Sequence, residues 1–343
     1  MKKTVVITVI SFIMIIEGSG QKQASIEDII TVDVMKSYSA KKELILQDFM
    51  DVEYIALETN DEFINQGWVM DIGEQIILVK NRINDGDIFV YDRNGKALRK
   101  INHKGQKTSE EYTHINTITL DEDNDEMFVN DINLRKIYVF DLYGKFKRSF
   151  DHQEGFGSFN VGSIKIKEHA YYSEILNYDK NNLLCYDGIN NGRTCILISK
   201  QDGSITKEII IPYKDKKSLT QRHINGEIYT EYRAPSIHRI IPYNGNWMLL
   251  ELSSDTVYEL LPNHSLRPFI ARTPSIQSMN PEVMLVLKLV SERYIFMETV
   301  KNEYDFDRND GFPKSYLMYD KQNKAFSGYS VYNSDFSKKK RYI

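Results

Sequence analysis

The sequence predicts an all-β protein built from repeated four-stranded antiparallel sheets, and three observations support this prediction. One hairpin pattern occurs five times: β-branched or aromatic residues, a polar turn, and a second run with apolar residues at alternate positions. The copies start at residues 87, 136, 195, 256 and 315, so the period is 49 to 61 residues. Two further strand-like runs precede the hairpins. Four antiparallel strands per unit at this period are typical of β-propeller blades.

One position in the hairpin pattern is restricted to a few residue types. Glycine adopts the left-handed backbone conformation freely, and Asn and His adopt it more often than most other residues. We therefore expect a left-handed turn residue at the ninth position of each copy. The copies span residues 87–101, 136–150, 195–209, 256–270 and 315–329, and their ninth residues are Gly95, Gly144, Gly203, His264 and Asn323.

The strands ahead of the hairpins are predicted from short runs of β-branched and apolar residues. They are WVMDI (68–72) and QIILV (75–79) before the first hairpin, and NTITL (116–120) and EMFVN (126–130) before the second. The run PEVMLVLKLVSERY (281–294) is rich in Val and Leu, and we interpret it as a buried strand. One such sheet cannot bury both of its faces alone, whereas stacked blades cover each other.

Residues 1–20 are predicted to be a signal peptide. Lys2 and Lys3 precede an uncharged apolar run, and Gly18 to Gly20 supply the small residues that a signal peptidase requires. An uncleaved anchor is the alternative, but the run is shorter than the roughly 20 apolar residues that span a bilayer. We expect an exported protein, periplasmic or associated with the cell envelope, without a lipobox cysteine.

Residues 21–67 are predicted to contribute a closing strand to a propeller formed by residues 68–343. The segment holds two strand candidates, ITVDVM (30–35) and VEYIALE (52–58), and we expect VEYIALE to cross back and complete the last blade. Only residues 330–343 follow the fifth hairpin, which is too few for the inner strands of another blade. The favoured plan is therefore six-bladed, with a last blade that is incomplete or completed by the N-terminal segment. The alternatives are a chain that is truncated relative to its family, and five blades that close with the N-terminal strands.

The two cysteines, Cys185 and Cys195, flank one turn and leave two alternatives open. Either the two residues face each other across neighbouring strands and form a disulfide in an oxidising compartment, or they are two small buried apolar residues. The formal net charge is −4, and the charges are mixed along the chain. We therefore expect no nucleic-acid partner, and interpret the terminal KKKR (338–341) as a solvated tail.

Residues 105–150 resemble an NHL-type repeat. Gly105, Glu111 and Tyr112 resemble its leading glycine and acidic-aromatic pair; Asp131, Asn133 and Arg135 resemble its strand-linking turn, and Gly144 its hairpin glycine. More widely, the leader, the VEYIALET entry and the five hairpins resemble the six-bladed, TolB-like propellers of Bacteroides-type cell envelopes. That family implies a propeller in the envelope and is typically lipoprotein, whereas this chain has Gly18 and Gly20 near the position of the lipid-bearing cysteine.

The loops between strands and between blades are expected to form the binding face. The longest connection, residues 212–236, carries Arg and Tyr, which combine charge-assisted hydrogen bonds with rigid apolar area. The alternative is that a long exposed loop is polar only to remain soluble. Asp131, Asn133 and Arg135 are interpreted as residues that hold a turn. The candidate ligand-binding residues are Arg222, Tyr229, Tyr232, Arg233, His238, Arg239, Tyr304 and Arg308.

No catalytic or metal-ligating residue is assigned, because the chain lacks H-E-x-x-H, G-x-S-x-G, Walker and G-x-G-x-x-G motifs. The acidic stretches 121–132 and 305–316 suggest calcium, but both lack the glycine and the final glutamate of an EF-hand loop. We therefore expect no cofactor. Calcium is the one cofactor that the acidic stretches suggest. His103 and His152 occupy equivalent places in successive repeats, and a structural role is favoured for both.

Two functions fit these patterns. The favoured one is an exported, non-enzymatic binding or scaffold propeller of the cell envelope, which holds a peptide, glycan or protein partner on its loop face. The alternative is a calcium-dependent hydrolase of the lactonase or esterase type, with a site on the propeller axis. That alternative needs acidic and amide ligands from several blades to converge.

Overall fold

The computed structural model describes residues 6–9, 29–38, 41–105, 110–161, 164–188, 193–225, 228–234 and 237–336. The chain divides into two compact units. Unit 1 comprises Met1–Ser11 and Val52–Ile210, and unit 2 comprises Phe12–Asp51 and Ile211–Ile343. Helix in the described ranges is limited to the short 3-10 turns η2 (Leu46–Asp48), η3 (Glu122–Asn124) and η4 (Ile276–Ser278). No helix there is long and apolar enough to cross a membrane.

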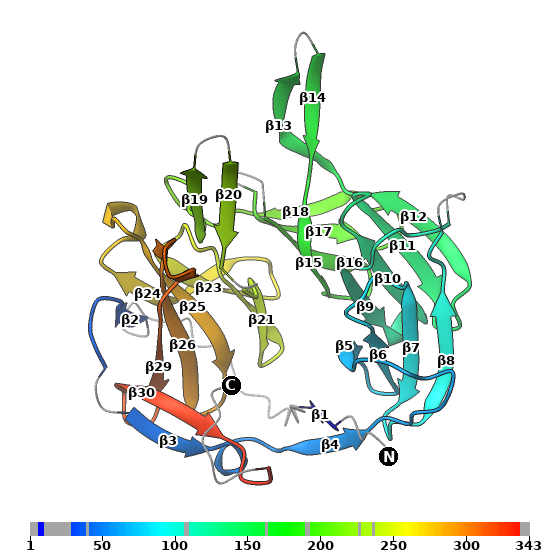
Figure 1. Cartoon of the computed structure of the whole chain (residues 1–343), viewed down its shortest axis with the longest axis horizontal. Helices are drawn as coiled ribbons and strands as arrows, with labels where there is room; N and C mark the ends of the chain where they lie inside the picture. Colours follow the sequence, from blue (N-terminus) through cyan, green and yellow to red (C-terminus); the bar gives the residue numbers. More distant parts are fainter. Residues whose placement is uncertain are drawn as a thin grey trace. The chain divides into compact units, whose positions relative to one another are not determined.

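Unit 1 contains three four-stranded antiparallel sheets, and in each sheet the strands lie in sequence order (Figure 1). The first sheet is formed by β5 (Trp68–Ile72), β6 (Ile76–Lys80), β7 (Asp87–Asp92) and β8 (Ala97–Asn102). The second is formed by β9 (Thr117–Asp121), β10 (Glu126–Asp131), β11 (Lys136–Asp141) and β12 (Phe146–Asp151). The third is formed by β15 (Tyr172–Asn177), β16 (Asn182–Asp187), β17 (Cys195–Ser199) and β18 (Ile205–Ile209).

The three sheets of unit 1 pack face to face, with their first strands side by side. One apolar cluster joins the first and second sheets, with Leu78 and Val90 against Met127 and Phe140. A second cluster joins the second and third sheets. The first strands are also linked directly, since the Leu120 N–H donates to Asp71 Oδ2 at 2.7 Å. Each sheet therefore hides an apolar face that it could not bury alone.

Unit 2 contains two five-stranded sheets that share a single apolar core. In both, four antiparallel strands in sequence order are extended by a parallel strand from the N-terminal segment. The first sheet is formed by β21 (Ile240–Tyr243), β22 (Asn246–Leu249), β23 (Thr256–Leu260), β24 (Leu266–Thr273) and β2 (Ile30–Asp33). The second is formed by β25 (Val283–Val290), β26 (Tyr294–Lys301), β29 (Lys314–Asp320), β30 (Ala325–Tyr332) and β3 (Lys41–Ile45).

All five predicted hairpins are confirmed, as antiparallel pairs β7–β8, β11–β12, β17–β18, β23–β24 and β29–β30. The stretch 281–294 is likewise a strand, β25. Gly95, Gly144, Gly203 and His264 have positive φ angles, between 65° and 92°. The expectation for Asn323 was wrong, because Lys324 adopts the left-handed conformation instead, at φ 50°. The Asp320 carboxylate accepts the N–H of Asn323 at 3.1 Å and moves the left-handed position one residue on.

The structure corrects the pairing predicted for VEYIALE. Its strand, β4 (Glu53–Ala56), pairs with β1 (Val6–Val9), which lies within the predicted signal peptide. Ile55 and Leu57 are buried against the first sheet of unit 1, so their apolar side chains fix the strand there. The N-terminal strand that joins the last sheet is instead β3, which pairs with β30 in parallel. The boundaries at residues 20 and 67 stay predictions.

Two hairpins lie outside the five-copy pattern, one of them within residues 212–236, which were predicted as a connection. One is formed by β13 (Glu154–Val161) and β14 (Ile164–His169), and the other by β19 (Thr220–Asn225) and β20 (Ile228–Arg233). A third, very short hairpin joins β27 (Tyr304–Asp305) to β28 (Asp310–Gly311). The β19 and β20 sequences, TQRHIN and IYTEYR, were difficult to recognise as strands because they are largely polar.

Cys185 and Cys195 are both buried free thiols. In the β16–β17 register, Cys195 lies opposite Tyr186, the neighbour of Cys185. Because successive residues of a strand point to opposite faces, the two sulfur atoms lie on opposite faces of the sheet. The alternative of two small buried apolar residues is therefore the one observed.

The turn glycines allow a test of how tightly the hairpins pack. Gly95 and Gly245 both have left-handed backbones, at φ 82° and 74°. A Cβ at Gly95 would collide with the carbonyl oxygen of Ala56, whereas one at Gly245 would meet nothing within 4 Å. We expect Gly95→Ala to lower the free energy of unfolding by about 2 kcal/mol more than Gly245→Ala, measured by urea denaturation. Equal losses would contradict the packing described for this turn.

Candidate functional site

Four of the eight predicted binding residues, Arg222, Tyr229, Tyr232 and Arg233, lie on the β19–β20 hairpin, which projects from unit 2 (Figure 1). Arg222 lies opposite Glu231, and Ile224 lies opposite Tyr229. Because residues two apart in a strand share a face, these four lie on one face together with Arg233. We call this set the outer face: Arg222, Ile224, Tyr229, Glu231 and Arg233.

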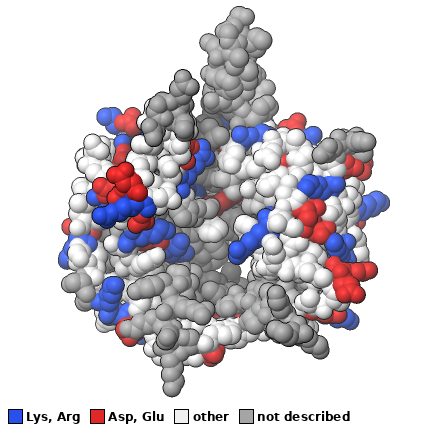
Figure 2. Space-filling model, viewed as in Figure 1, with Lys and Arg blue, Asp and Glu red and all other residues white. Residues whose placement is uncertain are grey.

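Glu231 organises the charges of the outer face. Its carboxylate accepts hydrogen bonds from Arg233 Nε at 2.6 Å, Arg222 Nε at 3.2 Å and the Tyr229 hydroxyl at 3.2 Å. The bond from Arg233 is the main cause that holds the pKa of Glu231 below its usual value. Two arginines share one carboxylate, so the outer face carries a net positive charge. On the surface as a whole, Lys and Arg are interspersed with Asp and Glu in this view (Figure 2).

The outer face is also open and partly apolar. Ile224 is 71% exposed and Tyr229 is 56% exposed. The side chains of Arg222 and Arg233 are 68% and 77% exposed, even though both are bound to Glu231. Tyrosine and arginine often carry much of the binding energy in protein interfaces. The exposed isoleucine adds apolar area that a partner can bury.

The opposite, inner face of the hairpin packs against the β27–β28 hairpin through an aromatic cluster, formed by His223, Tyr232, Tyr304 and Phe306. The rings of Tyr232 and Tyr304 stack with centroids 4.2 Å apart, and those of His223 and Phe306 stack at 4.4 Å. Gln221 adds a hydrogen bond from its amide to the Asn302 carbonyl at 2.8 Å. Tyr232 and Tyr304 therefore join two hairpins and hold the outer face in place.

The remaining predicted residues lie elsewhere. Arg308 is in the β27–β28 turn, with its Nε 3.6 Å from Asp305, while His238 and Arg239 precede β21. Sequence reasoning missed Glu231 and Ile224, which complete the outer face. The alternation of side chains through residues 220–233 was the signal that could have identified them.

Asp131 holds the turn that follows β10. Its Oδ2 accepts the backbone N–H groups of Thr113 at 2.6 Å and His114 at 3.0 Å, and its Oδ1 accepts those of Asn133 and Leu134, both at 3.0 Å. Arg135 adopts φ 54°, and its guanidinium lies 4.3 Å from the Tyr171 ring centre, just ahead of β15. These contacts give both residues a structural role.

The acidic stretch 121–132, considered for calcium, is held by other contacts. Lys200 Nζ lies 2.6 Å from Asp121 Oδ2, and both side chains are almost fully buried. Glu122 accepts the backbone N–H groups of Glu74 at 2.6 Å and Ile76 at 3.0 Å. Within the residues that the structure describes, no group of three or more His, Cys, Asp or Glu side chains is arranged to hold a metal ion.

The chain matches the DUF5128 family model, a 6-bladed β-propeller, over residues 21–342. It belongs to this family of six-bladed propellers. The sheets described above are thus blades, and the described ranges contain five sheets of four or five strands. No curated protein matches this propeller. The NHL-like and TolB-like resemblances stay predictions.

Two solved structures to which this chain is similar come from Bacteroides. A Bacteroides fragilis protein named as exported matches 88% of this propeller and 80% of its own chain, with 14% identity and a TM-score of 0.55. A DUF4221 family member from Bacteroides vulgatus matches 80% and 83% of the two chains, with 12% identity and a TM-score of 0.47. At 14% identity the likeness to the Bacteroides fragilis protein shows the fold alone.

His103 and His152, equivalent in the repeat, occupy similar environments. Each ring stacks on an aromatic residue, His103 on Phe140 at 4.7 Å and His152 on Tyr172 at 4.3 Å. His152 is buried, and its ring nitrogens lie 2.9 Å from Asn130 Oδ1 and 3.1 Å from the Ala170 carbonyl. Burial is the main cause that lowers the pKa of His152 to about 4.

This shift predicts a loss of stability in acid. The unfolded chain binds a proton at His152 near pH 6.5, but the folded chain does so only near pH 4, so the free energy of unfolding falls as pH drops through this window. We expect wild type to lose about 2 kcal/mol more than His152→Gln between pH 7 and pH 4.5, measured by urea denaturation. His238→Gln, at an exposed site, should behave as wild type. An identical acid loss in His152→Gln would refute the assignment.

Proposed function

We propose that this propeller is an exported binding protein of the cell envelope that holds a partner protein on its outer face. The observation that carries the proposal is the exposed combination of Ile224, Tyr229, Arg222 and Arg233 on one side of the β19–β20 hairpin. A partner protein is favoured over a glycan because Ile224, the more exposed of the two large apolar side chains of the outer face, offers sugar hydroxyls no hydrogen bond.

The outer face is arranged before any partner binds, which favours affinity. Glu231 fixes both guanidinium groups, and the aromatic cluster fixes the hairpin that carries them. Ordering a long side chain at an interface costs about 0.5 to 1.5 kcal/mol, and this cost is reduced when the side chain is already held. A partner with a carboxylate and an apolar side chain would pair with Arg233 and cover Ile224.

Export is supported by the leader sequence and by a relative. Residues 1–20 have the charged start, apolar run and small residues of a signal peptide. The Bacteroides fragilis protein of the same fold is itself named as exported. Together these favour an envelope location for the partner as well.

Export predicts a defined mature N-terminus. Protein recovered from outside the cytoplasm of the producing cell should begin at or near Gln21, as read by mass spectrometry of its N-terminal peptide. Replacing Ile10 by Lys, inside the apolar run, should leave uncleaved protein in the cytoplasm. Recovery of wild type only in the cytoplasm, still beginning with Met1, would overturn this part of the proposal.

Partner binding predicts site-specific crosslinking. A photoreactive phenylalanine analogue at Tyr229 should yield a discrete protein adduct in the producing cell, because this ring lies at the centre of the proposed interface. Tyr143 provides the matched control, since it is 78% exposed in the β11–β12 turn. Combining Arg233→Ala with the photoreactive residue at position 229 should reduce the yield of the adduct about tenfold.

Two results would contradict the proposed interface. One is the same set of adducts from positions 229 and 143, which would indicate random collision. The other is an adduct at position 229 that Arg233→Ala leaves unchanged. Circular dichroism of each variant should match wild type, because these side chains are exposed and support no core packing.

A further inference from the structure

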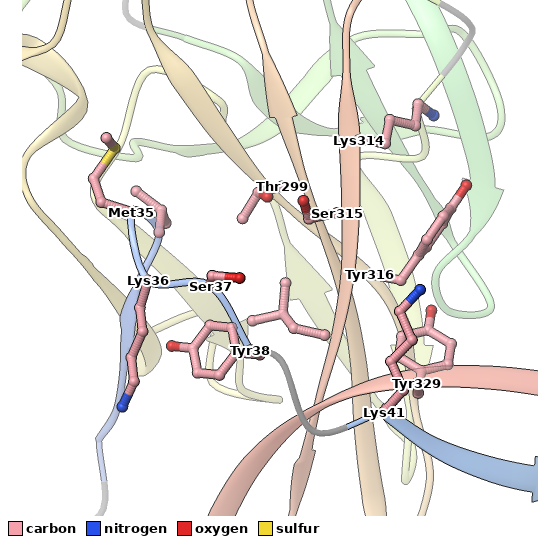
Figure 3. A pocket seen from close by; sticks show the side chains of 12 residues that line it. Met35, Lys36, Ser37, Tyr38, Lys41, Thr299, Lys314, Ser315, Tyr316 and Tyr329 are labelled. Carbon is pink, nitrogen blue, oxygen red and sulfur yellow. The ribbon is translucent and has the colours of Figure 1, made fainter.

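Unit 2 contains a pocket that lies apart from the β19–β20 hairpin. It has a volume of about 370 Å³ and lies between residues 34–38 and Lys41 of the N-terminal segment on one side and strands β26, β29 and β30 on the other (Figure 3). At about 30 Å³ per water molecule it holds roughly a dozen waters, more than a simple inorganic ion fills. Its size falls at the lower end of the range for small-molecule sites. We call it the strap pocket.

The pocket forms where two strands of the last sheet separate. β29 pairs with β26 from Lys314 to Asp320, but it pairs with β30 only from Leu317 to Asp320. The edge of β29 at Lys314 to Tyr316 is therefore left without β30, and the N-terminal segment covers this split. Both ends of that segment are anchored, through β2 on β24 and β3 on β30. The walls are thus fixed before a ligand enters.

The charges around the strap pocket favour an anion. Its lining includes Lys36, Lys41 and Lys314 but no Asp or Glu. Lys314 pairs with Glu298 at 3.2 Å, behind the lining. Within the described part of the chain, Lys36 and Lys41 have no carboxylate partner. Lys41 pairs with Gly328, and Gly328 with Leu317, so these three positions share one face of the sheet, whereas Tyr329 belongs to the other face. Lys41, Tyr316 and Tyr329 all line the pocket (Figure 3).

The neutral groups of the pocket favour a hydroxylated ring. The hydroxyls of Ser37, Thr299 and Ser315 face a common space (Figure 3). Tyr316 and Tyr329 supply aromatic surface, with ring centres 6.0 Å apart. Burial raises the pKa of Tyr329, so its phenol stays protonated and can donate a hydrogen bond. Hydroxyl groups exchange hydrogen bonds with sugar hydroxyls, and aromatic rings cover the apolar face of a sugar.

We propose that the strap pocket binds a small sugar acid, with the acidic group held by Lys41 and the ring held among the hydroxyls and tyrosines. A bare carboxylate would leave the three hydroxyls unused, and a neutral sugar would leave Lys41 without a partner. The site is independent of the outer face, so one protein would hold a protein partner and a small acidic ligand at separate places.

Titration calorimetry on the full chain tests the proposal. D-glucuronate should bind saturably at one site, and D-glucose and acetate at equal ionic strength should bind at least about tenfold more weakly. Lys41→Gln should weaken glucuronate binding about tenfold, since it removes one charge-assisted contact. Lys207→Gln, at an exposed lysine of β18, is the matched control and should bind as wild type.

A second measurement locates the ligand without a variant. Acetylation of lysines by a limiting reagent, read by mass spectrometry, should be slowed at Lys41 by glucuronate and unchanged at Lys207. The proposal is overturned if glucuronate shows no saturable binding, if acetate binds as well as glucuronate, or if Lys41→Gln binds as wild type. It is also overturned if glucuronate protects Lys207 as strongly as Lys41.

Discussion

The constraint on which the rest of this structure depends is that no blade can bury its own faces. A four-stranded sheet with apolar residues on both sides is stable only when neighbouring sheets cover it. In unit 1 the apolar clusters between successive sheets meet this need, and polar contacts such as Leu120 to Asp71 set the spacing of the first strands. The buried Lys200–Asp121 pair links the second and third sheets in the same way.

Because of this constraint, the side chains that stabilise the blades differ from those that we propose bind a ligand. Side chains that cover a neighbouring sheet cannot also face a ligand. The proposed binding groups lie where β29 and β30 separate and on two added elements, the β19–β20 hairpin and the N-terminal segment. Both elements are fixed by local contacts, the first by stacked rings and the second by parallel pairing at sheet edges. Function in this family can therefore change without a change in the blades.

The fold was largely predictable because its signals are local. The alternation of apolar residues, the turn glycines and the period of the repeat each fall within a few residues of sequence. The errors arose where pairing is distant or polar: KKELI (41–45) reads as charged surface, yet its backbone extends the last sheet as β3. Three of the five outer-face residues, Arg222, Tyr229 and Arg233, were predicted from the sequence. The strap pocket was missed because it joins Lys41 to residues more than 250 positions away.

The segregation of the β19–β20 hairpin into two faces has a consequence for how this family can diversify. The rings of the inner face hold the hairpin in place, so mutations there would be selected against for stability. The outer side chains contribute little to folding, and drift at Arg222, Ile224 or Tyr229 carries almost no thermodynamic penalty. The specificity proposed for this hairpin could thus change by a handful of codon changes that leave the blades intact.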